Sequence, residues 1–383
     1  MKHKLRIYAE ALIIAAVFTL LAGMGAFRSM DNTVSDALYH QGSLTDGEIV
    51  VIGMDQAAVD ALGPMPWPRS YMADVISYLN SNPDAKPAAI GIDVLYVGES
   101  ADQDADAYLA EAAALGDNVV MAAAATFGSD LVTEADDFYM DTMAVLGWDE
   151  PFEALKNVSQ IGHINAMADT DGIIRHALLK VDAPEGEVYS FARVLYEKYA
   201  AYHGLQVSAL PKTDGNGFFY LPYTAKPGRN YDGISFVDVL DGLVEPEYFA
   251  GKIVLIGPYT AGMQDEYRTS IDHAAPMYGI EIQANQIEAY RNGFLPVEVS
   301  DWIQLALLFI WCAILAYVLK DCKVIYSIII WLAVSCGWAG LCYLMYQAGF
   351  VLHVLWFPLA ATVLFVYSMT INYIRSNKEK QRI

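Results

Sequence analysis

Cysteine is absent from residues 28–300, because all four cysteines of the chain lie further on, at Cys312, Cys322, Cys336 and Cys342. A disulfide framework is therefore excluded for this long segment, which has to fold on a hydrophobic core. The sequence also shows no Cys/His spacing typical of a metal site. The patterns G-x-S-x-G, H-E-x-x-H, G-x-x-x-x-G-K-[ST] and G-x-G-x-x-G are missing, so common hydrolase, zinc-protease and nucleotide-binding motifs are absent.

Basic residues are scarce in the same segment. It holds 14 of the 23 Lys and Arg residues of the chain, but 41 of the 45 Asp and Glu residues. This charge would repel a phosphate backbone, so we exclude binding to nucleic acid. The acidity instead favours cations, cationic ligands or simple solubility.

Long apolar stretches occupy residues 302–319, 324–346 and 350–374, with connections of only four and three residues. Each stretch is long enough to cross the roughly 30 Å hydrocarbon core of a lipid bilayer as a helix. A fourth apolar stretch, 7–27, follows the short basic N-terminus 1–6. We therefore predict four transmembrane helices, the first of them an uncleaved signal anchor rather than a cleaved signal peptide.

Lysine and arginine predict the orientation of these helices. The connection 320–323 carries two lysines, the connection 347–349 carries no charge, and the tail 375–383 holds four basic residues. We therefore expect both termini in the cytoplasm, the domain 28–300 outside, and the tail as the start of a cytoplasmic connector helix.

Short apolar runs alternate with helical patterns in the segment 28–300. This order is typical of an α/β domain with a mostly parallel sheet. The acidic stretch 127–153 has no clear pattern and predicts an irregular surface insertion, while 160–181 predicts a hairpin with its turn at Asp169–Gly172. The expected buried strands are 48–54, 88–92, 118–124 and 252–257, and the expected helices are 69–79, 104–115, 189–203 and 279–292.

Three acidic residues follow expected strands: Asp55 and Asp93 directly, and Asp265 in the loop after a third strand. The carboxyl ends of parallel strands line the binding crevice of such sheets, so we expect these residues in one ligand site. Three carboxylates there would suit Ca²⁺ or Mg²⁺. The alternative is that the acids cap helices or pair with Arg69 and Arg268. We also expect Arg69 and Arg268 to contribute to the ligand site.

Six blocks of the segment form a recognisable series, in this order: IVVIGMD with GPMPWPRS, AAIGIDVLY, GHINAMADTDGIIRHALL, YSFARVLYEKY, GKIVLIGPYTAGMQDEY and GIEIQANQIEAYRNGFLP. Together they cover nearly all of 31–296. The series resembles the CHASE family of type two, the cyclase/histidine-kinase-associated extracellular sensor domain, and three closely spaced transmembrane helices after the domain are also that family's arrangement.

The resemblance implies a receptor in the bacterial plasma membrane that senses an external small molecule, ion or envelope protein. It also implies a cytoplasmic effector, for which we expect a class III adenylate or guanylate cyclase, with a histidine or Ser/Thr kinase as the alternative. Class III cyclases build their active sites between two catalytic domains, so a cyclase implies a homodimer. The sequence ends at residue 383 without a catalytic domain, which we interpret as a truncation; a natural effector-free protein that binds a cell-envelope partner is the other interpretation.

Overall fold

The chain forms two units in the computed structural model, which describes residues 2–380 except 135–136, 229–230, 232, 263–264 and 321. The sheet domain comprises Gln41–Leu295, and the helical unit comprises Met1–His40 together with Pro296–Ile383. The sheet domain is therefore inserted into the helical unit in sequence. Residues 381–383 of the predicted connector helix lie outside the described residues.

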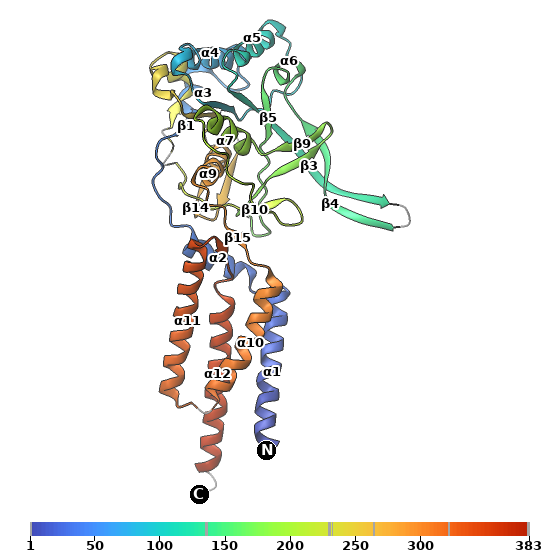
Figure 1. The fold of residues 1–383 in the computed structure, drawn as a ribbon, viewed down its shortest axis with the longest axis vertical. Coiled ribbons are helices and arrows are strands. Elements are labelled where there is room, and N and C mark those ends of the chain that lie inside the picture. Colours follow the sequence, from blue (N-terminus) through green and yellow to red (C-terminus); the bar gives the residue numbers. More distant parts are fainter. Residues whose placement is uncertain are drawn as a thin grey trace. The chain divides into compact units, whose positions relative to one another are not determined.

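A seven-stranded sheet organises the sheet domain (Figure 1). Parallel strands run in the order β11-β1-β12-β2-β3-β5, and β4 pairs antiparallel with β3. This confirms the predicted α/β class. The strands are β1 (Ile49–Met54), β2 (Ala89–Ile92), β3 (Val119–Glu134), β4 (Asp137–Asp149), β5 (Gln160–His163), β11 (Ile234–Ser235) and β12 (Ile253–Pro258).

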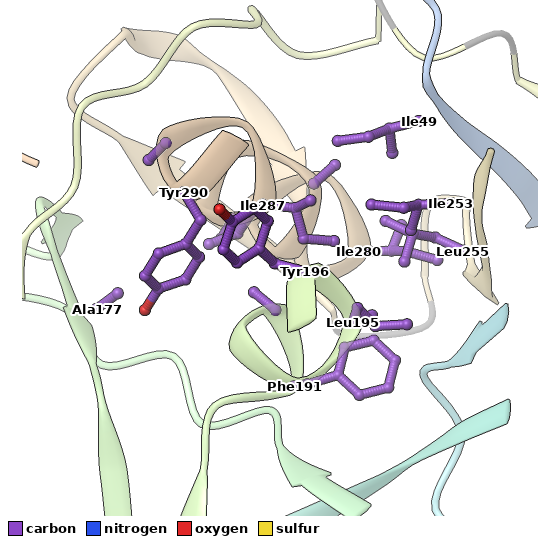
Figure 2. Close-up of a cluster of buried hydrophobic side chains, with 14 of the residues drawn as sticks. Ile49, Ala177, Phe191, Leu195, Tyr196, Ile253, Leu255, Ile280, Ile287 and Tyr290 are labelled. Carbon is purple, nitrogen blue, oxygen red and sulfur yellow. The ribbon is translucent and has the colours of Figure 1, made fainter. Parts of the chain in front are cut away.

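The central strands are buried on both faces, as their unbroken apolar sequences require. One face packs against α7 (Phe191–Tyr202) and α9 (Gly279–Asn292), and Figure 2 shows this core around Leu195, Ile280 and Tyr290. Each such fully buried side chain contributes about 1.5–3 kcal/mol of transfer free energy. The other face is covered by α3 (Gln56–Leu62), α4 (Arg69–Leu79), α5 (Gln103–Ala114) and α8 (Phe236–Leu240).

Helix α7 approaches the sheet so closely that glycine is required in strand β5. A Cβ atom on Gly162 would lie 2.5 Å from the Cα atom of Phe191, the first residue of α7. A side chain at this position would therefore push the helix away from the sheet.

Two expectations about the surface of the domain were wrong. Residues 127–153 are mostly not irregular, because β3 and β4 form a long antiparallel hairpin (Figure 1). Residues 160–181 do not form one hairpin either: β5 joins the main sheet, β6 (Ile173–Ile174) pairs with β13, and β7 (His176–Leu178) pairs with β10. The remaining short elements of the domain are α6 (Glu153–Lys156), β8 (Lys180–Ala183), β9 (Gly186–Tyr189), β10 (Phe218–Tyr220), β13 (Glu266–Thr269), β14 (Asp272–Tyr278) and two 3₁₀ turns, Pro83–Ala85 and Pro246–Phe249.

The helical unit contains three helices that are long and apolar enough to cross a membrane: α10 (Asp301–Leu319), α11 (Val324–Gln347) and α12 (Trp356–Lys380, with its apolar part at Trp356–Ile374). The end of α1 (Lys2–Gly23) and α2 (Arg28–Tyr39) meet at a 76° bend and supply up to one more span. The protein is thus a membrane protein with three to four apolar helices. Short strands β15 (Val297–Glu298) and β16 (Phe350–Val351) pair beside them.

Candidate acid-pair site at the carboxyl edge of the sheet

Asp93 follows β2 at the carboxyl edge of the sheet and is only 7% exposed. Its main-chain N–H donates to Ile256 of the neighbouring strand β12 at 2.8 Å, which fixes the residue against that strand. A Cβ atom on Gly257 would lie 2.9 Å from the Cβ of Asp93 and 2.9 Å from Ile280 at the start of α9. Glycine at 257 is therefore what lets Asp93, β12 and α9 meet.

Asp265 reaches the same place from the loop after β12. Its main-chain oxygen accepts a hydrogen bond of 3.1 Å from the N–H of Gly279, the first residue of α9. Its carboxylate occupies the space that a side chain at 279 would need, since a Cβ there would lie 2.5 Å from Oδ1. The carboxylate of Asp265 thus lies at the N-terminus of a 14-residue helix, where the peptide dipoles favour a negative charge.

Both carboxyl groups have a raised pKa, chiefly because they are buried. Burial raises the pKa of Asp93 to about 8, and the nearby charge of Asp265 adds to the effect. Burial also raises the pKa of Asp265 to about 6, although the Tyr267 hydroxyl and the Gly279 N–H oppose this rise. Between these two values Asp93 holds a proton while Asp265 is ionised. The pair therefore carries one negative charge near neutral pH.

The side chain of Asp93 is buried, and the charge that acts on it is the negative charge of Asp265. A buried carboxyl group is costly when ionised, which explains why it takes up a proton. Protonation of the Asp93 carboxyl group removes this cost.

Glu281 is a buried acid in the first turn of α9, and it was not predicted from the sequence as a site residue. Its Oε1 accepts hydrogen bonds from the Gly228 N–H at 2.6 Å and the Tyr259 hydroxyl at 3.1 Å, and its Oε2 accepts one from the Tyr278 N–H at 3.1 Å. Burial raises the pKa of Glu281 despite these donors. An acid at the third position of a helix can cap its own N-terminus, and this spacing is the pattern that could have identified Glu281.

Asp55 lies at the same edge but serves as a helix cap. Its Oδ1 accepts hydrogen bonds from the Ala58 N–H at 2.9 Å and from the Ser235 hydroxyl at 2.7 Å. These contacts fix the start of α3 and attach it to the end of β11. For Asp55 the structure favours the capping alternative.

The two predicted arginines do not join the acid pair. Arg69 forms a 2.8 Å ion pair with Asp106 and lies over the rings of Tyr96 and Phe152. Arg268 is exposed on β13, where its backbone pairs with β6. The positions predicted from sequence therefore divide into an acid pair, a helix cap and separate arginines.

Metal binding stays a prediction. Among the described residues, no group of three or more His, Cys, Asp or Glu side chains is arranged to hold a metal ion. Asp93 and Asp265 supply two carboxylates, whereas Ca²⁺ takes six to eight oxygen ligands. A cation at this pair would need further oxygen ligands from water or from the main chain.

A large α/β domain inserted in sequence between apolar helices defines a membrane-anchored protein with one large folded domain outside its apolar helices in sequence. The family model of the CHASE2 domain matches residues 11–319, which is most of the chain. The protein belongs to the CHASE2 family, and it is a membrane sensor of that family. No curated protein matches the chain, and no solved structure matches it.

The raised pKa of Asp93 predicts how stability depends on pH. Because the folded pKa lies above the ordinary value of 3.8, the folded state binds the extra proton, and stability falls as pH rises from about 4 to about 8. Asp93→Asn removes the titrating group. We expect the variant to be more stable than the wild type near pH 8–9 by more than about 1 kcal/mol, since one pKa unit corresponds to about 1.4 kcal/mol.

Thermal unfolding of the detergent-solubilised chain over this pH range checks the prediction. Asp241→Asn, which removes an exposed carboxylate of the same domain, is the control and should leave the pH dependence unchanged. An Asp93→Asn protein that loses stability with pH as steeply as the wild type would contradict the assignment.

Proposed function

We propose that the sheet domain of this CHASE2 sensor receives an external stimulus and transmits it through the apolar helices to a cytoplasmic class III adenylate or guanylate cyclase. The observation that carries the proposal is the insertion of the domain between α1–α2 and α10. Both ends of the domain continue directly into the helical unit, so a change inside the domain acts on two membrane helices at once.

The proposed orientation places both termini in the cytoplasm of a bacterium. Two lysines, Lys320 and Lys323, lie at the connection between α10 and α11, whereas the turn that follows α11, 348–349, carries no charge. Positive charge retains a loop on the cytoplasmic side, and the acidic sheet domain would then lie outside.

The effector and the oligomeric state are linked in this proposal. Helix α12 continues past the apolar segment to Lys380, so a cytoplasmic domain attached to it would be joined by a continuous helix. A class III cyclase needs two catalytic domains for its active sites, so the proposal includes a homodimer. Two α12 helices, one from each subunit, would then determine the distance and orientation between the two catalytic domains.

The proposed stimulus site is the Asp93–Asp265 pair, and the proposed stimulus is positive charge. A proton neutralises Asp93 directly, and Ca²⁺, Mg²⁺ or a protonated amine would relieve the same repulsion. A ligand changes the populations of two states of the domain only if it binds them with different affinity. We propose that a proton or cation binds the Asp93–Asp265 pair more tightly in the state in which the pair is buried next to the first turn of α9.

Cysteine labelling tests the orientation. In a cysteine-free background, Ala348→Cys places a thiol at the exposed turn after α11, and Lys323→Cys places one before α11. We expect a membrane-impermeant maleimide to label position 348 in intact cells, and position 323 only after the membrane is opened. Labelling of 323 but not 348 in intact cells would contradict the orientation.

A chimera tests transmission. The catalytic domain of a class III adenylate cyclase is fused after residue 383, and cAMP is measured as external pH, Ca²⁺ or Mg²⁺ is varied. We expect wild-type activity to change about fivefold or more, a usual size for coupling between sites, and Asp93→Asn to lose the change.

Asp241→Asn should respond like the wild type in the same assay. An equal response in Asp93→Asn would remove the acid pair as the stimulus site. A chimera with active catalytic domains that responds to none of these cations would contradict positive charge as the stimulus.

A further inference from the structure

His353, in the connection between α11 and α12, lies between two carboxylates of the helical unit. Its Nδ1 is 2.5 Å from Oδ2 of Asp31, and its Nε2 is 3.0 Å from Oδ1 of Asp301. Both ring nitrogens therefore donate, which requires the protonated ring, and charge-assisted hydrogen bonds of this kind are strong. Asp31 belongs to α2 and Asp301 begins α10, so one ring joins three segments that are far apart in sequence.

The neighbouring groups hold the ring in this position. It stacks on Trp356, the first residue of α12, with ring centroids 3.7 Å apart. The other carboxylate oxygen of Asp31, Oδ1, accepts a hydrogen bond from the main-chain N–H of Leu355 at 2.6 Å. The side-chain oxygen of Gln304 in α10 accepts one from the main-chain N–H of His353 at 2.8 Å. Asp31 is 1% exposed, so its charge depends on these donors.

The same connection is attached to both of its neighbours along the backbone. Strand β16 pairs in parallel with β15 just before α10, with Val297 opposite Phe350. The Tyr39 hydroxyl at the end of α2 donates to the Leu352 carbonyl at 2.8 Å. The connection 348–355 is therefore fastened to α2 on one side and to the start of α10 on the other.

These two segments are also the covalent links to the sheet domain. Helix α2 ends at Tyr39, just before the domain begins at Gln41, and the domain ends at Leu295, just before β15 and α10. Helix α12 has no such link and begins at Trp356, three residues after His353.

We propose that the Asp31–His353–Asp301 cluster is the coupling element of the sensor, which joins both links from the sheet domain to α12. A displacement of either link then moves α12 through His353, whereas loss of the cluster weakens this coupling and leaves only the main-chain contacts of the connection and the packing of α12. The proposal rests on the function proposed above, because it assigns the route by which the stimulus would reach α12.

The cluster is sensitive to pH in a defined direction. Burial would lower the pKa of His353, but the carboxylates of Asp301 and Asp31 outweigh it and raise the pKa to about 9. The stabilisation is therefore complete below the ordinary value of 6.5 and is lost as pH rises through about 9. Other titratable groups that interact with the carboxylates of the cluster are Arg28 and Tyr39 of α2 and Cys342 of α11. Tyr346 of α11 stacks on Tyr39.

Distance measurements between spin labels on the full-length chain test the coupling without any effector. Labels are placed at Val34 of α2 and Val363 of α12, both 40% exposed, after the accessible Cys322 and Cys336 are changed to Ser. At neutral pH we expect one narrow distance distribution in the wild type. His353→Gln should broaden it, and raising the pH of the wild type through about 9 should have the same effect.

Asp301→Asn is the second variant, because Asp301 is half exposed and its loss leaves Asp31 paired with the ring. It should give intermediate broadening and lower the pH at which broadening begins. His203→Gln, which removes a histidine of the sheet domain, is the matched control and should match the wild type. A narrow distribution in His353→Gln at all pH values would overturn the proposal.

The chimera separates this proposal from the proposed function. If the wild-type chimera responds to its stimulus and His353→Gln responds equally, the cluster is not the coupling element. If His353→Gln broadens the distances but no chimera responds, the cluster links α2 to α12 and the proposed stimulus is wrong. Loss of the response in His353→Gln with retained basal cyclase activity supports both.

Discussion

The burial of the Asp93 carboxyl group beside Asp265 constrains the packing at the carboxyl edge of the sheet. The group lies where β2, β12 and the first turn of α9 meet, and glycines at 257 and 279 provide the space for the two acids. An apolar residue at position 93 would avoid the cost of a buried charge. A carboxyl group at this point instead makes the stability of the domain depend on pH, at the expense of stability at high pH.

Asp93 is neutral and His353 is positively charged when protonated, yet both groups have a raised pKa and respond to pH in the same direction. Asp93 takes up a proton because burial disfavours its charge, whereas His353 keeps its proton because two carboxylates favour the charge. In both places the protonated form is the one that fits the folded structure. A rise in pH therefore weakens both, first the acid pair and then the contacts of His353.

The sequence predicted the α/β class because its central strands are continuous apolar runs, which only a sheet covered on both faces accommodates. It also placed Asp93 and Asp265 at the correct edge. It could not show that β12 lies between β1 and β2, and this order is what brings Asp265 to Asp93. Asp55 follows its strand in the same way, but local contacts with Ala58 make it a cap. The pairing of Asp31 with His353 depends on the packing of four helices, and no local sequence pattern encodes it.

The pKa of Asp93 implies that its carboxyl group is protonated at neutral pH inside the folded domain. Infrared difference spectroscopy of the full-length chain measures this directly, because a protonated carboxyl group has a C=O stretching band distinct from that of a carboxylate. We expect a buried carboxyl band that disappears with a midpoint near pH 8 and is missing from Asp93→Asn. A wild-type protein whose carboxyl groups are all ionised by about pH 6 would contradict it.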